Sequence, residues 1–281
     1  MHDPKVPETL EGWSILHQMF RLRWSDWRAL PAPDRATRAA EAAQALAGMQ
    51  RGSQGTTFAT TMLGHKGDLM LVHLRRNFED LQAAQVAVAR LGLAPYLEPT
   101  TSFVSIVELG MYEMTALVHR RLGERGLVAG SEEFESAFDA EMEEQRQRVL
   151  GRLFVEVPPR RYVCFYPMNK RRGEQRNWYA EPVEERARMM LDHGKVGRHF
   201  AGRVTQVISG AIGLDDWEWG VDLFADDPLV FKKLIYELRF DEASVWYAEF
   251  GPFYVGLQFS PSELPRYLEG ELPAFNPKPS L

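Results

Sequence analysis

The stretch GHKGDLMLVHL, residues 64–74, is followed 149 residues later by GLDDWEWGVDL, residues 213–223. Each begins with a Gly-containing turn and continues as an apolar run of the length and character of a strand. A second strand-like run precedes each stretch, at 57–63 and at 204–213, so each half carries a hairpin. One hairpin recurring in two halves of the chain predicts an internal duplication.

The segments around the two hairpins follow one order. In the first half they are a strand at 13–24, a helix at 34–49, the hairpin, a helix at 77–91 and a strand at 102–112. In the second half they are a strand at 161–168, a helix at 181–200, the hairpin, a helix at 227–240 and a strand at 244–259 with a bulge near Gly251 and Pro252. The expected fold class is α+β, with two ferredoxin-like βαββαβ repeats whose sheets pack face to face or close into a dimeric α+β barrel-type fold.

Three units follow from this order. Residues 1–114 form the N-terminal repeat, 115–160 a charged helical connector, and 161–281 the C-terminal repeat with a Pro-rich tail from 271. Within the connector, Ser131 precedes an acidic, amphipathic run and is expected to cap a helix.

Charge and composition exclude several classes of protein. The net charge of −6 leaves no excess of Lys and Arg to neutralise phosphates, which argues against a nucleic-acid binder. The sequence has no run of 18 apolar residues, so no membrane-spanning helix is predicted. The N-terminus lacks the pattern of a signal peptide. A single cysteine, Cys164, rules out an intrachain disulfide. Together these features favour a cytoplasmic protein.

His193 stands out in the helix expected at 181–200. The residues that share its helical face are Met189, Met190, Gly197, Phe200 and Val204. From these residues alone, a packed histidine with one hydrogen bond is the more common outcome. An axial ligand of heme iron is the alternative, because Met and Phe around a neutral imidazole suit a porphyrin face. Gly197 costs about 1 kcal/mol in a helix, which either close helix–sheet packing or a flat ligand would offset.

Three long motifs occur in order: YVCFYPMNKRRGEQRNWY at 162–179, ERARMMLDHGKVGRHFAGRVTQVISGAIGLDDWEWGVDLFADD at 185–227 and FKKLIYELRFDEASVWYAEFG at 231–251. With EGWSILHQMFRLRW and SFVSIVELGMY in the first half, they make the chain similar to the coproheme decarboxylase branch of the chlorite dismutase family. The resemblance covers nearly the whole chain and is weakest at 113–151.

The resemblance implies a homopentamer of α+β barrels with a porphyrin in the C-terminal half. It also implies a reaction: hydrogen peroxide oxidatively decarboxylates coproheme III (iron-coproporphyrin III) to heme b through a three-propionate intermediate. This is the last step of coproporphyrin-dependent heme biosynthesis, so a ferrochelatase is the expected donor of the substrate.

The resemblance also assigns roles to residues of this sequence. His193 would be the proximal iron ligand, Tyr166 the redox-active tyrosine, and Lys170 a propionate ligand that assists proton transfer. The other binding residues would be Arg152 and Arg239 for propionates, Ser244 and Tyr112 for hydrogen bonds, Met168 at the porphyrin edge, and Gln206 on the distal side.

Particular residues, or heme binding itself, distinguish the alternative functions. Chlorite dismutases carry an arginine where this chain has Gln206, and a neutral amide suits peroxide better than an anionic oxychlorine species. A non-enzymatic heme carrier or sensor would need His193 but not Tyr166, and a cofactor-free monooxygenase would bind no heme. For the hydrogen-bond partner of His193, Asp192 points about 100° away on the helix, whereas Glu242 could reach.

Overall fold

The computed structural model describes residues 6–50 and 54–275, and within these ranges nine strands form one antiparallel sheet. The end of the expected Pro-rich tail, 276–281, and the first five residues of the N-terminus lie outside them. The strands are β1 (Thr9–Leu22), β2 (Gly55–Met62), β3 (Leu69–Arg75), β4 (Leu97–Gly110), β5 (Tyr162–Lys170), β6 (Val204–Gly210), β7 (Trp219–Ala225), β8 (Ala248–Phe250) and β9 (Tyr254–Phe259). The helices are α1 (Trp24–Ala29), α2 (Ala32–Gly48), α3 (Phe78–Ala89), α4 (Tyr112–Glu124), α5 (Glu132–Leu153), α6 (Val183–Arg198), α7 (Leu229–Leu238), α8 (Glu242–Tyr247) and α9 (Leu264–Leu268).

Each half of the chain has the strand order of a ferredoxin-like repeat. Strands β4, β1, β3 and β2 lie side by side in the first half, and β9, β5, β7 and β6 correspond to them in the second. The repeats join at both edges, through β2 with β9 and β4 with β6, so the strands other than β8 close into a barrel. The α+β fold of two ferredoxin-like repeats is therefore confirmed, and the sheets close rather than stack.

The two repeats are offset by 150 residues, not by 149. Strand β3 begins at Leu69 and β7 at Trp219, and each has seven residues. The offset of 149 matched Leu74 with Leu223, but Leu74 packs inside the barrel and Leu223 on the outer face of the second repeat. Side chains alternate along a strand, so an error of one residue exchanges the two faces. The error arose because the turn residues before the two strands differ in number: 64–68 precede β3, whereas 213–218 precede β7.

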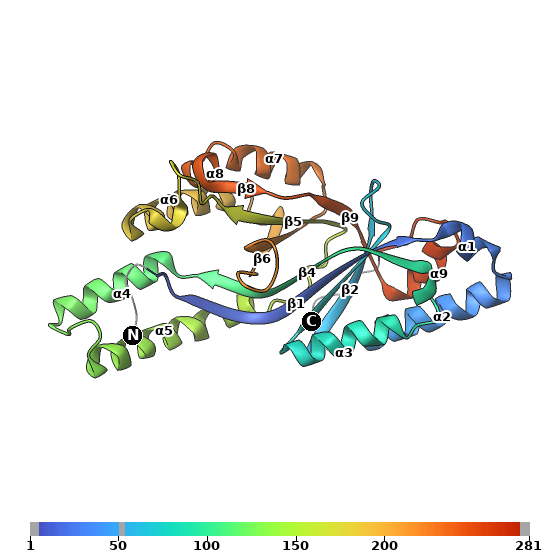
Figure 1. Cartoon of the computed structure of the whole chain (residues 1–281), viewed down its shortest axis with the longest axis horizontal. Coiled ribbons are helices and arrows are strands. Elements are labelled where there is room, and N and C mark those ends of the chain that lie inside the picture. Colours follow the sequence, from blue (N-terminus) through green and yellow to red (C-terminus); the bar gives the residue numbers. More distant parts are fainter. Residues whose placement is uncertain (1–5, 51–53, 276–281) are drawn as a thin grey trace.

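Helices cover the barrel in two groups (Figure 1). Helices α2 and α3 lie over the outer face of the first repeat, and α6 and α7 over that of the second. The interior is filled by side chains from both repeats, including Phe58, Phe103, Phe165 and Phe224. The second outer face is therefore separate from the barrel core and accessible to its own helices. None of the helices in the described ranges is both long and apolar enough to cross a membrane.

The connector forms a helical hairpin, α4 and α5. Its helices pack through Val118, Leu122, Phe134 and Phe138. Ser131 caps α5 as expected, because its hydroxyl accepts a hydrogen bond from the Phe134 N–H at 3.2 Å. Helix α4 packs against α6, so the connector supports the helix that carries His193.

The last expected strand, 244–259, was wrong as a single element. Its first residues form α8, because the Asp241 carboxylate accepts the Ser244 N–H at 3.0 Å and starts a helix there. The remainder is divided into β8 and β9 by Gly251 and Pro252, and proline has no N–H for a ladder. Likewise the first strand ends at Leu22, and Trp24 begins α1.

Candidate functional site

The outer face of the second repeat carries several of the predicted site residues. Tyr166 and Met168 lie on it from β5, in or against one apolar cluster. Gln206 lies on it from β6, because its neighbour Val207 points into the barrel. Strand β7 lies between β5 and β6, and adjacent strands are about 4.8 Å apart. Gln206 is exposed, so this end of the face is open.

Tyr166 is 2% exposed and lies in a cage of aromatic rings. Its ring centroid is 4.7 Å from that of Phe253 and 5.7 Å from that of Phe250. Arg239, at the end of α7, places its guanidinium 4.0 Å from the centre of the Phe250 ring. Burial raises the pKa of Tyr166 well above its usual value, against the opposing charge of Arg239. The phenol therefore stays protonated at neutral pH, the state that can lose a proton and an electron together.

Helix α6 brings His193 to the same face. Phe200, just after this helix, lies in the same apolar cluster as Tyr166, and Val196 of the helix packs against that cluster. His193 lies one turn before Val196. The Nδ1 atom of His193 is 3.1 Å from Oδ2 of Asp241, whose side chain is 5% exposed. A carboxylate only accepts hydrogen bonds, so Nδ1 carries the proton. Nε2 then keeps the lone pair that a metal needs, in the arrangement typical of histidine ligands.

Asp241 is held in place from a second side. Both the N–H and the hydroxyl of Ser244 donate to its carboxylate at 3.0 Å. Burial by itself would raise the pKa of Asp241, but the hydrogen bond and charge of His193 and the bonds from Ser244 outweigh it, so the pKa lies below its usual value. Glu242, which the sequence left as a partner that could reach His193, instead pairs with Arg188 at 2.7 Å. The sequence left this partner open, and the structure gives the role to Asp241, the N-cap residue of α8.

Gly197 lies on α6 one turn after His193. A Cβ built on it would meet no described atom within 4 Å. Close helix–sheet packing therefore does not explain this glycine, whereas a flat ligand beside the helix would use the space.

Lys170 ends β5 as a buried cation, 8% exposed. Its Nζ lies 4.3 Å from the centre of the Trp178 ring, and its backbone N–H donates to Glu218 at 2.8 Å. Burial lowers the pKa of Lys170 to about 8, although Asp241 and Glu218 favour the charged form. The ring of Tyr112 packs against Trp178 at 6.1 Å, and burial raises the pKa of this tyrosine. The connector helix α4 thus reaches the site through its first residue, Tyr112.

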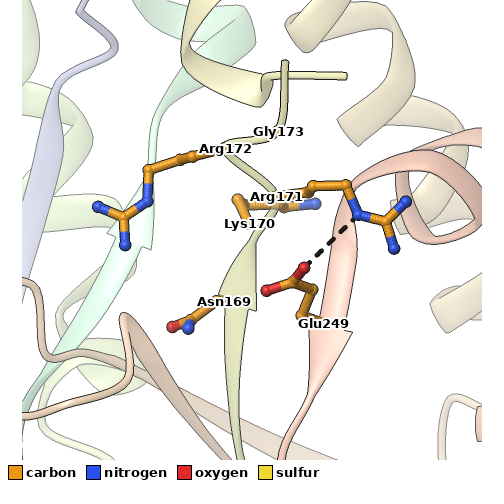
Figure 2. A pocket seen from close by; sticks show the side chains of 6 residues that line it. All are labelled: Asn169, Lys170, Arg171, Arg172, Gly173 and Glu249. Carbon is orange, nitrogen blue, oxygen red and sulfur yellow. Dashed lines mark ion pairs between the residues drawn. The ribbon is translucent and has the colours of Figure 1, made fainter. Parts of the chain in front are cut away.

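A pocket of about 390 Å³ opens beside Lys170 (Figure 2). Its lining consists of Asn169, Lys170, Arg171, Arg172, Gly173 and Glu249. The two arginines point in opposite directions (Figure 2), Arg171 toward Glu249 at 3.5 Å and Arg172 toward Glu218 at 3.6 Å. The pocket is a cationic margin of the site and lies outside the Tyr166 cage.

Arg152 is the predicted residue that the structure leaves apart. It is exposed in the last turn of α5. Across the described ranges no hydrogen bond or ion pair joins it to Tyr166, Lys170 or His193. Its contact with a propionate stays a prediction from the resemblance.

Sequence reasoning missed Asp241, Trp178 and Phe253. Asp241 had a usable signal, because Asp is among the preferred N-cap residues of helices. Trp178 and Phe253 had none, since their role depends on which ring lies next to Lys170 or Tyr166 in space.

The fold and the site together define a class: duplicated α+β barrel proteins with a carboxylate-supported histidine over one outer face. The chain belongs to the chlorite dismutase family, whose model, described as chlorite dismutase, matches residues 35–259.

The relatives at about 40% identity are named coproheme decarboxylase or putative heme-binding protein. The chain is 41% identical to the coproheme decarboxylase of Staphylococcus saprophyticus, over 90% of this chain and 94% of that protein. It is 42% identical to a putative heme-binding protein of Natronomonas pharaonis over 94% of this chain, but spans only 42% of that protein's length. Among solved structures, a heme-binding protein from Thermus thermophilus matches with 40% identity and a TM-score of 0.80, covering 96% of this chain and 100% of that chain.

Proposed function

We propose that this chain is a coproheme decarboxylase, which uses hydrogen peroxide to convert coproheme III to heme b through a three-propionate intermediate. It would thus catalyse the last step of coproporphyrin-dependent heme biosynthesis. One observation carries the proposal: His193, paired with Asp241, lies on α6 one turn before Val196, which packs against the apolar cluster of the caged, buried Tyr166. The relatives named above support it.

The reaction removes one carboxylate at a time. Each propionate side chain, with one hydrogen peroxide and one proton, gives a vinyl group, carbon dioxide and two waters. The C–COO⁻ bond breaks, and a hydrogen leaves the carbon attached to the ring. Peroxide is reduced, and the bound iron of the substrate supplies the redox chemistry that connects the two changes.

The chain's own residues hold and move protons and electrons. His193 binds the iron through Nε2 while Asp241 fixes its ring. Tyr166 loses a proton and an electron, and its phenoxyl takes a hydrogen from the propionate. Lys170 binds a propionate as the ammonium and moves a proton as the amine, because a pKa of about 8 makes both forms accessible. The further binding residues are Arg152 and Arg239 for carboxylates, Ser244 and Tyr112 for hydrogen bonds, Met168 at the porphyrin edge, and Gln206 on the distal side.

Gln206 favours decarboxylation over chlorite chemistry. It is an exposed neutral amide on the open end of the face, which stabilises an anionic oxidant less than an arginine would. A heme carrier would not require the buried tyrosine and lysine.

The setting is also part of the proposal. We infer a homopentamer, a cytoplasmic location that suits the single, buried Cys164, and a transient contact with the ferrochelatase that makes the substrate. The division into 1–114, 115–160 and 161–281 is proposed as two repeats with a helical connector between them, and its first boundary falls within α4.

Coproheme turnover tests the function directly. Purified protein is given coproheme III and hydrogen peroxide, and the porphyrin is followed by mass spectrometry. The expected result is successive loss of two carboxyl groups with their hydrogens. Binding without any loss of mass would leave a heme carrier and exclude the decarboxylase.

A further inference from the structure

The loop Gly251–Phe253 supplies one wall of the Tyr166 cage. It joins β8 to β9 and carries Phe253, whose ring is the nearer of the two against Tyr166. The Gly251 N–H donates to the Pro167 carbonyl at 2.9 Å. A Cβ at Gly251 would lie 2.8 Å from the Pro167 side chain, so the loop is pressed against β5. Pro252 offers no N–H, so the far end of the loop needs another anchor.

That anchor comes from the first repeat. Lys66, in the turn between β2 and β3, donates from Nζ to the Phe253 carbonyl at 2.6 Å. Its ammonium also lies 5.4 Å from the centre of the Tyr254 ring. In the same turn the Leu63 N–H donates to the Val255 carbonyl at 2.8 Å. The turn therefore holds the chain on both sides of Tyr254.

The seam beneath this turn is tight. Strands β2 and β9 pair up to Met62 and Gly256. A Cβ at Gly256 would lie 1.7 Å from the Thr61 carbonyl oxygen, which leaves no room for any other residue. The turn is thus fixed relative to β9, and a contact from Lys66 is transmitted to Phe253 instead of being lost in motion of the turn.

We propose that Lys66 is a positioning residue for Tyr166, an inference that rests on the proposed function. The connection runs from the Lys66 ammonium to the Phe253 carbonyl, and from the Phe253 ring to the phenol of Tyr166 at 4.7 Å. Lys66 touches neither substrate nor reacting atoms. It sets the angle at which the phenol faces the propionate, so one residue of the first repeat controls the chemistry of the second.

The first measurement needs no substrate. Hydrogen exchange of the peptide around 250–256 is compared in wild type, Lys66→Met, Lys66→Arg and His65→Gln. Lys66→Met keeps the aliphatic stem but has no donor, so exchange should rise by roughly threefold or more. Lys66→Arg should restore the wild-type rate, because a guanidinium also donates to a carbonyl. His65→Gln, an exposed neighbour in the same turn, is the matched control and should change nothing.

The second measurement uses coproheme and peroxide. Lys66→Met should slow the first decarboxylation severalfold at saturating coproheme, with coproheme affinity unchanged and the tyrosyl radical spectrum altered, since that spectrum depends on ring orientation. If wild type makes no heme b, the proposed function fails. If wild type turns over and Lys66→Met has the same rate and radical spectrum, the positioning role fails, even if the loop exchanges faster.

Discussion

The two repeats have the same strand order, but their outer faces carry side chains of different character. The offset of 150 residues pairs His73 of β3 with Leu223 of β7. On the neighbouring strand of each repeat, Thr57 of β2 lies opposite His73, and Gln206 of β6 lies opposite Leu223. The position that holds an exposed amide in the second repeat thus holds a buried hydroxyl in the first.

A second pair shows the same contrast. Gln18 of β1 pairs with Leu71, as Tyr166 of β5 pairs with Val221, so Gln18 is the first-repeat counterpart of Tyr166. His73 joins the first-repeat side chains, with Nδ1 2.8 Å from the Thr57 hydroxyl and Nε2 3.1 Å from the Gln18 side-chain oxygen. The first face is closed by its own hydrogen bonds, whereas the second keeps its tyrosine among rings. Topology provides two equivalent faces, and the side chains make them chemically different.

The largest effect should come from Tyr166→Phe. Removing the hydroxyl removes the hydrogen that the proposed radical step needs, so coproheme conversion should fall to background while coproheme still binds. Mass spectrometry of the porphyrin and an absorbance titration measure the two. Tyr162→Phe, on the same strand and face, is the control and should convert coproheme normally. A Tyr166→Phe enzyme with the wild-type rate would contradict the difference between the faces.

Asp241→Asn should have the next largest effect. Loss of the carboxylate weakens the orientation and basicity of His193, and such changes lower metal affinity by roughly 10–100-fold. Coproheme titration, with the iron spectrum as readout, checks it. Glu242→Gln is the matched control, because Glu242 pairs with Arg188 instead. A larger loss of coproheme affinity in Glu242→Gln than in Asp241→Asn would show that Glu242, and not Asp241, supports His193.

Lys170 should make coproheme affinity depend on pH. Burial lowers its pKa to about 8, so the ammonium is present below that pH and is lost above it. A bound propionate favours the charged form, so affinity should decrease as pH rises through 8, by at most about tenfold per pH unit. Dissociation constants from pH 7 to 10 measure this. Lys170→Met should bind more weakly at pH 7 and show no such slope, whereas Lys232→Met, an exposed control on α7, should keep it.

His73→Leu should have the smallest effect on the chemistry. It places the second repeat's residue in the first and leaves the Thr57 hydroxyl and the Gln18 oxygen without this partner, which costs about 1–3 kcal/mol of unfolding free energy. Urea unfolding at pH 7 measures the loss, and turnover per folded molecule should not change. A fall in turnover per folded molecule would mean that the first face takes part in catalysis.

The same variant tests acid stability. Burial, with the charges of Arg75 and His17, lowers the pKa of His73 to about 3. Between that value and the unfolded pKa near 6.5 only the unfolded chain binds the proton, so this contribution to stability is lost as pH falls below about 6.5. His73→Leu should lose less stability on acidification over this range than wild type does.

Periodicity and order in the sequence were sufficient for the repeats. Alternating apolar runs around two turns predicted the hairpins, and the helices α2, α3, α6 and α7 lie where 3.6-residue patterns indicated them, because local periodicity decides which face is buried. The register between the repeats was wrong by one residue, because an extra residue in a turn exchanges the two faces of the strand that follows. The division of 244–259 was missed because a helix cap outweighed the apolar character of that segment.

The site depended on both levels. Local spacing left His193 between a packed histidine and an iron ligand, and only the match of long motifs favoured the ligand. In the structure, Asp241 and not Glu242 is the hydrogen-bond partner of His193, and Trp178 lies beside Lys170. Neither pair is close enough in sequence for a pattern to connect its members.

The sequence by itself determined that this chain is a duplicated α+β protein, because strand and helix periods are local properties. Its long motifs, through their resemblance to a known family, set apart a tyrosine, a lysine and a histidine in the second half. The tertiary structure alone decided that the barrel closes, that Asp241 supports His193, and that a lysine of the first repeat holds the loop beside Tyr166. These depend on contacts between residues far apart in the chain, among them the pairing of β2 with β9 and of β4 with β6 that closes the barrel.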